Sequence, residues 1–465
     1  MQTLFRCLFC LGLILSYSLS VVPQSIDTTT RRHYEKIAED IIYSGLGSGK
    51  AYEILRELVS TSGPRLSGSP QAAKAVEWSK ETMEKLGFDN VHLEPVMVPH
   101  WVRGVEEASL IGSESKGNES LTICALGGSI GTPEDGLTAE VLEVKSFDEL
   151  KKLKDQAKGK IIFFNRPMDR SKINTFEAYG GAVNQRGSGA VEAGRVGGVA
   201  ALVRSMTTVI DDFPHTGAMG YNDSIPKVPA AAISTKDANM LSELLAREKT
   251  VRVRMKLSCE TLPDVESANV IGELTGSEKP NEVVVIGGHL DSWDKGQGAH
   301  DDGAGCAHVI EALRLLKELG LKPKRTIRVV LFINEENGLR GGKAYAAKTR
   351  PGETHIAALE TDAGGFTPRG FGVQADSIRF DKIARWSFLF SSISADRIRK
   401  GGGGADISEL ARQGVPAIGL NVDGQKYFDY HHSDHDIIDN VNERELELGA
   451  ISIAILAYVI AQEGL

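Results

Sequence analysis

Residues 283–305 read VVVIGGHLDSWDKGQGAHDDGAG, and this stretch decides the fold. Its β-branched start, Val283–Ile286, is typical of a strand buried on both faces in the middle of an α/β sheet. Glycines and a glycine-rich loop follow, and an amphipathic helix is predicted from about Ala304 to Leu319. Ligands of open α/β sheets bind beyond the carboxyl ends of the strands. Three side chains are predicted at that edge of the sheet: His289, Asp291 and Asp301.

Later parts of the chain repeat this arrangement of an apolar strand followed by polar side chains. Residues 326–334, TIRVVLFIN, lead into Glu335 and Glu336, and a third strand over 356–360 leads into Asp362. Imidazoles and carboxylates without a thiolate form a donor set that suits zinc. Five such ligands exceed the needs of one catalytic zinc and fit two zinc ions that share a carboxylate. The five candidate metal ligands are His289, Asp301, Glu336, Asp362 and His432.

Each candidate also has an ordinary structural interpretation. Asp301 lies just before a helix, where aspartate often caps the helix start, and Asp362 before glycines is a common turn residue. The adjacent Glu335 and Glu336 could form a solvated surface pair, and a lone histidine is most often structural. The group favours chemistry because its acids follow apolar strands that converge on one rim, which solvated acids do not need. The spacing therefore predicts a metal-dependent hydrolase.

The same motifs resemble those of a known family. HLDS at 289–292, GAHDDG at 298–303, NEENG at 334–338, ETD at 360–362 and HHS at 431–433 follow the order found in the di-zinc peptidases of family M28. That family includes aminopeptidases and glutamate carboxypeptidases. The resemblance implies an α/β fold: a three-layer α/β/α zinc-exopeptidase sandwich with a mixed sheet, interrupted by an inserted protease-associated (PA) domain.

The resemblance also implies a role for each candidate ligand. Asp301 would bridge two Zn²⁺ ions per chain. His289 and Asp362 would complete one zinc site, and Glu336 and His432 would complete the other.

Three further residues receive roles from the same resemblance. Glu335 would be the general base, which takes a proton from a zinc-bridging water and returns it to the leaving amine. Asp291 would orient the imidazole of His289. His431 stands where the glutamate-carboxypeptidase branch has a tyrosine, so it could steady the oxyanion or support the site from behind.

The chain divides into five predicted segments. Arg6 precedes an apolar run, Cys7–Leu15, and small residues follow it, which is typical of a secretory signal peptide cleaved after Ser20. The middle of the chain alternates short strands with helices and carries no metal-ligand group, so it is interpreted as the insert. The segments are a signal peptide at 1–20, a pro-segment or N-terminal extension at 21–48, catalytic parts at 49–118 and 265–465, and the PA insert at 119–264.

Composition limits the classes of function. The net charge of −9 and pI of about 5.8 disfavour a nucleic-acid partner. A final amphipathic helix is predicted over 443–462, with an apolar tract too short and too interrupted to span a membrane. Cys124, Cys259 and Cys306 allow at most one disulfide. Asn118 and Asn222 begin sequons, which are candidate glycosylation sites in a secreted chain.

Together these features predict a secreted or lysosomal di-zinc exopeptidase that hydrolyses short peptides, chiefly unsubstituted dipeptides. A homodimer is implied by the resemblance alone. The alternatives are an aminopeptidase that trims longer peptides and a non-catalytic receptor-like relative, which should have lost ligands or the base. The substrate end that is recognised stays open, because no Arg or Lys is tied to the pocket by the sequence.

Some residues near the motifs stay ambiguous. His300 could bond a carboxylate or face solvent, and solvent is favoured. Trp293 could line the pocket or belong to the core. The glycines of 401–404 could shape a substrate pocket or provide flexibility, and Asp406 is assigned no chemistry.

Overall fold

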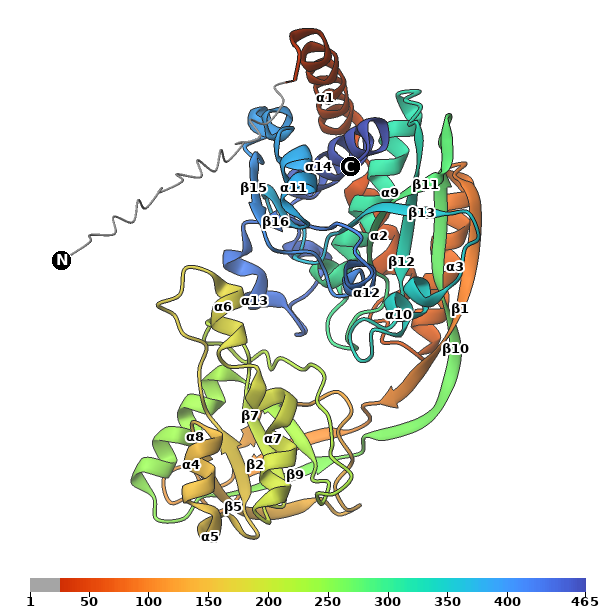
Figure 1. Ribbon diagram of the computed structural model, residues 1–465. Helices are drawn as coiled ribbons and strands as arrows, with labels where there is room; N and C mark the ends of the chain where they lie inside the picture. Colours follow the sequence, from red (N-terminus) through yellow and green to blue (C-terminus); the bar gives the residue numbers. More distant parts are fainter. Residues whose placement is uncertain (1–25) are drawn as a thin grey trace, which may run out of the picture.

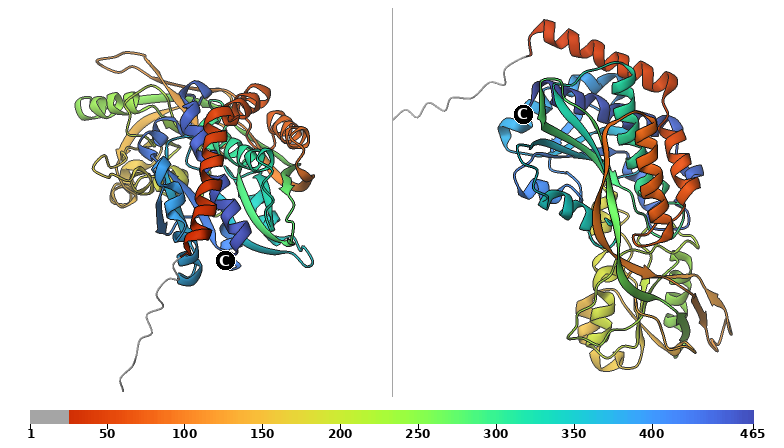
Figure 2. Two further views of the ribbon diagram at one scale, coloured as in Figure 1. Left: turned by 90° about the horizontal axis from the view of Figure 1, so that it is seen from above. Right: turned by 90° about the vertical axis from the view of Figure 1, so that its right-hand side faces the viewer.

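The computed structural model describes residues 26–465, which form two modules joined by long strands (Figure 1). Each module is built on an eight-stranded sheet. The predicted signal peptide at 1–20 lies outside the described residues. In Figures 1 and 2, β1 (Asp89–Val102) and β10 (Glu260–Leu274) run from the first sheet toward the second module.

The first module has the predicted mixed sheet, in the strand order β1-β10-β12-β11-β13-β16-β14-β15. The four central strands β12, β11, β13 and β16 are parallel, whereas β1 pairs antiparallel with β10 and β14 pairs antiparallel with β16. Their bounds are β11 (Lys279–His289), β12 (Arg325–Phe332), β13 (Thr354–Glu360), β14 (Pro368–Gln374), β15 (Arg397–Lys400) and β16 (Ala417–Val422).

Strand β11 is buried on both faces, as its β-branched run predicts. Val284 and Ile286 pack into one apolar cluster, and Val283 and Val285 pack into another on the opposite face. Helices α2 (Ala51–Ser62), α3 (Pro70–Lys85), α9 (Ala304–Glu318) and α14 (Glu443–Glu463) cover the first face; α10 (Arg340–Ala347) and α12 (Ser408–Arg412) cover the second. The sheet between two helical layers confirms the predicted α/β/α sandwich.

Helix α14 corrects one expectation. It has 21 residues with a mean hydropathy of 1.5 over its most apolar window, so by length and composition it could cross a membrane. The prediction that its apolar tract is too short and interrupted was therefore wrong. The helix is apolar because it is a core helix: 83% of that window is buried inside the protein, largely against α9 and α1.

Helix α1 (Thr28–Ser48) occupies most of the segment predicted as a pro-segment or extension. Asp27 caps it by accepting hydrogen bonds from Thr29 N and Thr30 N. Tyr34, Ala38 and Ile41 are buried on its inner side. Figure 2 shows α1 lying beside α14, so this segment is packed into the first module.

The second module has the strand order β3-β2-β9-β5-β6-β7-β8-β4. The predicted boundary at residue 119 falls inside it, because β2 precedes that residue and buries Ala108 and Leu110 in this module's core. Its strands are β2 (Glu106–Leu110), β3 (Ser120–Leu121), β4 (Ile123–Ala125), β5 (Leu137–Val144), β6 (Ile161–Phe164), β7 (Ala200–Arg204), β8 (Ala230–Ile233) and β9 (Arg252–Leu257). Its helices are α4 (Phe147–Lys152), α5 (Lys154–Ala157), α6 (Thr175–Gly180), α7 (Asn184–Arg195) and α8 (Thr235–Arg247).

Candidate metal centre

The five predicted ligands meet at one rim of the first sheet. His289 is the last residue of β11, Glu336 follows β12, and Asp362 follows β13. Asp301 lies in the turn before α9, and His432 follows the short helix α13 (Tyr427–Tyr430). Parallel strands bring their carboxyl ends to the same edge, so residues far apart in the sequence become neighbours.

Asp301 lies between two imidazoles and offers a different oxygen to each. Nε2 of His289 is 3.3 Å from Oδ1 of Asp301 and 3.6 Å from Oδ1 of Asp362. Nε2 of His432 is 3.2 Å from Oδ2 of Asp301 and 3.1 Å from Oε2 of Glu336. Two groups of three ligands therefore share one carboxylate.

This donor set fits cations. Oδ2 of Asp301 and Oδ1 of Asp362 are buried and accept no hydrogen bond from residues 26–465, which is costly unless a positive charge satisfies them. Ligands about 2.0–2.1 Å from a tetrahedral zinc lie roughly 3.3 Å from one another. The separations between imidazole and carboxylate atoms match that spacing, and the residues present therefore fit zinc.

Two neighbouring residues could also contribute metal-binding atoms. His431, Asp301 and His432 offer ligand atoms within 4.8 Å of one another, as do Asp302, His289 and Asp362. The carboxylate of Asp302 is already engaged, because Oδ2 accepts from His289 N (3.1 Å) and Oδ1 from Gly305 N (2.9 Å).

The sequence motifs did not identify Asp302 as a residue of the site. Its bond to Gly305 N is the helix-capping contact that an Asp-Asp pair before a helix suggests. Its second oxygen holds the backbone of His289 at the end of β11.

Asp291 makes a contact that differs from the expected one. Nδ1 of His289 lies 2.9 Å from the backbone carbonyl oxygen of Asp291, but 3.9 Å from its carboxylate. The carboxylate instead accepts hydrogen bonds from Glu335 N (3.0 Å) and Ser67 Oγ (2.8 Å). Its side chain therefore positions the predicted base rather than the imidazole, while its main chain orients the imidazole.

Glu335 and Glu336 are neighbours with different surroundings. Oε2 of Glu336 faces His432 and its Oε1 accepts from Trp293 N (3.2 Å), whereas Glu335 forms no ion pair among residues 26–465. Both glutamates line a cavity of about 440 Å³ at the centre, together with Asp301, Asp362 and His432. Burial raises the pKa of Glu335 well above its usual value; the carboxylate of Asp362 adds to this and His289 opposes it.

The second module forms hydrogen bonds to the backbone of the histidine pair His431 and His432. Nδ1 of His215 donates to the carbonyl oxygen of His431 at 2.6 Å. Thr216 N donates to the carbonyl oxygen of His432 at 2.9 Å, and Nδ1 of His432 lies 3.3 Å from Thr216 O. The sequence carries no local signal for these contacts, because the partners lie 216 residues apart.

His431 stacks directly on His432, with ring centroids 3.5 Å apart. Its Nε2 lies 3.8 Å from Oδ2 of Asp301, and its Nδ1 has no hydrogen-bond partner within residues 26–465. Burial lowers the pKa of His431 well below its usual value, and His432 lowers it further, so this imidazole is neutral.

The expectation that His300 faces solvent was wrong. Its ring is buried and stacks with both Phe366 (ring centroids 4.3 Å apart) and Tyr430 (5.1 Å). Nδ1 accepts from Gly365 N at 3.2 Å, and burial lowers the pKa of His300 to about 4. The turn before α9 folds inward, so its residues are covered by the loop after β13 and by α13.

The structure also shows the surroundings of Trp293, of the glycine loop 401–404 and of Asp406. Trp293 is buried in the second module's apolar core and meets His432 edge-on at 5.7 Å. Gly403 and Gly404 line a cavity, and a side chain at Gly404 would collide with Glu360. Asp406 is buried and neither of its carboxylate oxygens accepts a hydrogen bond from the described residues.

None of the cysteines or sequon asparagines is a predicted ligand, although Sγ of Cys306 donates to the carbonyl oxygen of His289 (3.1 Å). Cys124, Cys259 and Cys306 are buried and free, so the one disulfide that the sequence allowed does not form among them. Asn118 and Asn222 are exposed on the second module.

Comparisons with known proteins agree with the motifs. The model of peptidase family M28 matches residues 269–458. Carboxypeptidase Q of Bos taurus is 39% identical, covering 92% of this chain and 89% of that protein; the Homo sapiens protein is 38% identical, covering 93% and 92%. The crystal structure of a peptidase M28 precursor from Shewanella amazonensis has a TM-score of 0.88 and 37% identity, covering 93% of this chain and 97% of that one.

Proposed function

Because the chain belongs to peptidase family M28, we propose that it is a di-zinc exopeptidase of short peptides, with unsubstituted dipeptides as its main substrates. Membership of this family makes the chain a zinc metallopeptidase. The number of zinc ions and the preference for short peptides are proposed from the arrangement of the predicted ligands. The single observation that carries the proposal is the carboxylate of Asp301, which offers one oxygen to His289 and the other to His432. One carboxylate shared between two ligand groups is an arrangement that suits a pair of metal ions.

Each zinc ion would have its own pair of ligands besides Asp301. His289 and Asp362 would hold one, and Glu336 and His432 would hold the other. When bound, the two ions would lower the pKa of a water molecule and polarise the scissile carbonyl.

Glu335 is proposed as the general base. Its backbone is held by Asp291, and its side chain lines the cavity beside the centre while that of Glu336 turns to His432. A carboxylate in this place can take a proton from the attacking water and return it to the leaving amine.

His431 is proposed to donate a hydrogen bond to the substrate carbonyl oxygen. It lines the same cavity as Glu335 and is held neutral, so it has one N–H to offer. The bond from His215 fixes the backbone from which this side chain projects.

The second module is proposed to act as a PA-type cap that restricts substrate length. Thr175 Oγ1 donates to Gly424 O (2.8 Å), and Gln425 Nε2 donates to Ile173 O (2.8 Å). These bonds tie a loop of the second module to the first module at a second cavity, of about 670 Å³, which shares Asp362 with the cavity that Glu335 lines. A substrate that fits beneath this loop has few residues.

Secretion or delivery to the lysosome, glycosylation at Asn118 and Asn222, and a homodimeric state remain proposals that accompany this function. The exposure of both asparagines is compatible with glycosylation.

The function is tested with a peptide panel and one variant. Zinc-loaded protein is assayed on a free dipeptide, its N-acetylated and C-amidated forms, and a peptide of six residues. We expect hydrolysis of the free dipeptide, and about 10²–10⁴-fold lower turnover with unchanged zinc content for Glu335→Gln. Cleavage of the long peptide alone would favour the aminopeptidase alternative, and no cleavage at two zincs per chain would favour a receptor-like relative. Normal turnover of Glu335→Gln would exclude its role as base.

A further inference from the structure

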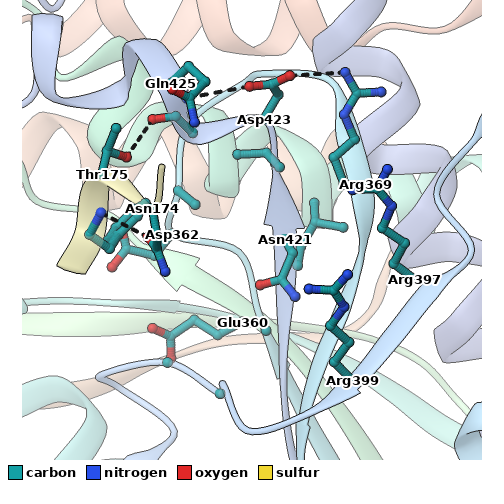
Figure 3. Close-up of a pocket in the computed structure, with 18 of the residues that line it drawn as sticks. Asn174, Thr175, Glu360, Asp362, Arg369, Arg397, Arg399, Asn421, Asp423 and Gln425 are labelled. Atoms are coloured by element: carbon teal, nitrogen blue, oxygen red, sulfur yellow. Dashed lines mark hydrogen bonds and ion pairs between the residues drawn. The ribbon is translucent and has the colours of Figure 1, made fainter. Parts of the chain in front are cut away.

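A cavity of about 670 Å³ lies beside the metal centre and shares Asp362 with it (Figure 3). Pockets for small ligands have volumes of roughly 300–1,000 Å³, so a short peptide fits this one. Both modules line it: the second module contributes residues 173–176, and the first contributes the ends of β13, β14, β15 and β16. The centre therefore opens into a space whose far walls belong to other strands.

Backbone rather than side chains forms the floor of this cavity. Gly372 of β14 stands opposite Gly419 of β16, and a side chain at either position would strike the backbone of the loop 401–404. Gly403 and Gly404 of that loop line the cavity directly. Gly372 and Gly419 therefore let the loop 401–404 pack directly against the sheet, and glycines of that loop face the cavity.

The far wall carries positive charge. Arg397 and Arg399 lie two residues apart on β15, so they share a face of that edge strand. Arg369 comes from the adjacent strand β14. Figure 3 shows these three arginines along one side of the cavity, with Glu360 and Asp362 on the other side.

Only one of these arginines has an acidic partner among residues 26–465. Arg369 pairs with Asp423 at 3.0 Å. Arg397 and Arg399 form no ion pair and donate no side-chain hydrogen bond within the described chain, although both line the cavity. Arg397 and Arg399 are like charges on one strand that repel each other, and an anion between them relieves that repulsion. The wall is therefore complementary to a carboxylate.

We propose that Arg397 and Arg399 bind a carboxylate of the peptide substrate while its scissile bond lies at the metal centre. Guanidinium groups bind carboxylates through paired, charge-assisted hydrogen bonds, and Asn421 in the same wall offers an amide to the ligand. The group recognised is either the terminal carboxylate of the substrate or an acidic side chain, which share this chemistry. The inference rests on the proposed peptidase function and adds the substrate class.

The test compares charged and neutral forms of the same peptides. Zinc-loaded full-length protein is assayed on Ala-Ala against its C-terminal amide, and on Glu-Ala and Ala-Glu against Gln-Ala and Ala-Gln. We expect the double variant R397Q/R399Q to raise KM about tenfold for the carboxylate-bearing form of one pair. Its kcat for that peptide, its kcat/KM for the neutral form and its zinc content should stay near wild type.

Arg369→Gln is the matched control, because its charge is already balanced by Asp423. It should shift KM by less than about threefold, since an exposed ion pair contributes little. Loss of discrimination in the amide pair identifies the terminal carboxylate, and loss in a Glu/Gln pair identifies an acidic side chain.

Two results would overturn the inference in different ways. If wild-type protein hydrolyses peptides but does not distinguish charged from neutral forms, or if R397Q/R399Q leaves every KM unchanged, the carboxylate site is refuted and the peptidase function stands. If the zinc-loaded protein hydrolyses no peptide in the panel, the proposed function fails and the inference fails with it.

Discussion

The contact between His215 and His431 makes the second module part of the metal centre. We consider the replacement of His215 by leucine, which removes the donor, and by asparagine, which keeps an N–H near the position of Nδ1. His215 is buried, and burial lowers its pKa to about 3, so the ring is neutral and Nδ1 carries the proton that it donates. Leucine therefore removes one buried hydrogen bond without removing a charge.

The size of the effect follows from the environment of that bond. A buried carbonyl that loses its partner costs about 1–3 kcal/mol. The next residue, His432, has a φ of 63°, in the left-handed region that disfavours side chains by about 1–2 kcal/mol. If His215 and Thr216 together hold this conformation, the leucine variant must order the loop when the metal binds. We therefore expect its zinc Kd to rise about 10–100-fold, as for other residues that orient metal ligands.

The assay is a zinc titration against a chromophoric chelator, combined with thermal unfolding of the metal-free protein. His215→Asn should keep a Kd within about threefold of wild type, because it can still donate to His431. A leucine variant that unfolds at a lower temperature but binds zinc with the wild-type Kd would refute the reasoning. The bond would then stabilise the fold without positioning the ligand.

Two further predictions concern the ligands and the sheet. His432→Ala should bind less zinc per chain than wild type by elemental analysis, and unchanged content would exclude it as a ligand. Burial raises the pKa of Glu94, but His92, Lys348 and Arg350 outweigh this and hold that pKa to about 2. The pKa of Glu94 is lower in the folded protein than in the unfolded chain. Ionised Glu94 therefore stabilises the protein above about pH 4.5, and this stabilisation is lost as the pH falls toward 2. Glu94→Gln should lower the free energy of unfolding by about 1–3 kcal/mol at pH 7. The difference in this free energy between wild type and variant should become smaller from pH 4.5 to pH 3, and a difference that stays constant over this range would contradict the prediction.

The ligands could be predicted from the sequence because each carries a local signal. The apolar runs that become β11, β12 and β13 end directly at or before His289, Glu336 and Asp362, and parallel strands bring those ends together. The inserted second module follows from the alternation of short strands with helices in the middle of the chain, whereas the mixed sheet was implied only by the resemblance to family M28.

The remaining parts of the site depend on contacts that no local pattern records. His215 and Thr216 reach the histidine pair from a strandless segment of the other module. Arg397 and Arg399 lie on a short edge strand whose place in the sheet depends on the order of its neighbours. The same limit explains His300 and α14, because burial is decided by what packs over a residue rather than by its own composition.

The charges of the two walls explain why the cavity is arranged in this way. Burial raises the pKa of Glu335 well above its usual value and that of Glu336 to about 7. Metal ions favour their ionised forms, and binding of zinc is therefore linked to release of protons. With zinc bound, the metal-bearing wall would attract a peptide carbonyl oxygen, and Arg397 and Arg399 on the opposite wall would attract a carboxylate. A substrate would then be held at two points, and this would set its orientation relative to the proposed base, Glu335.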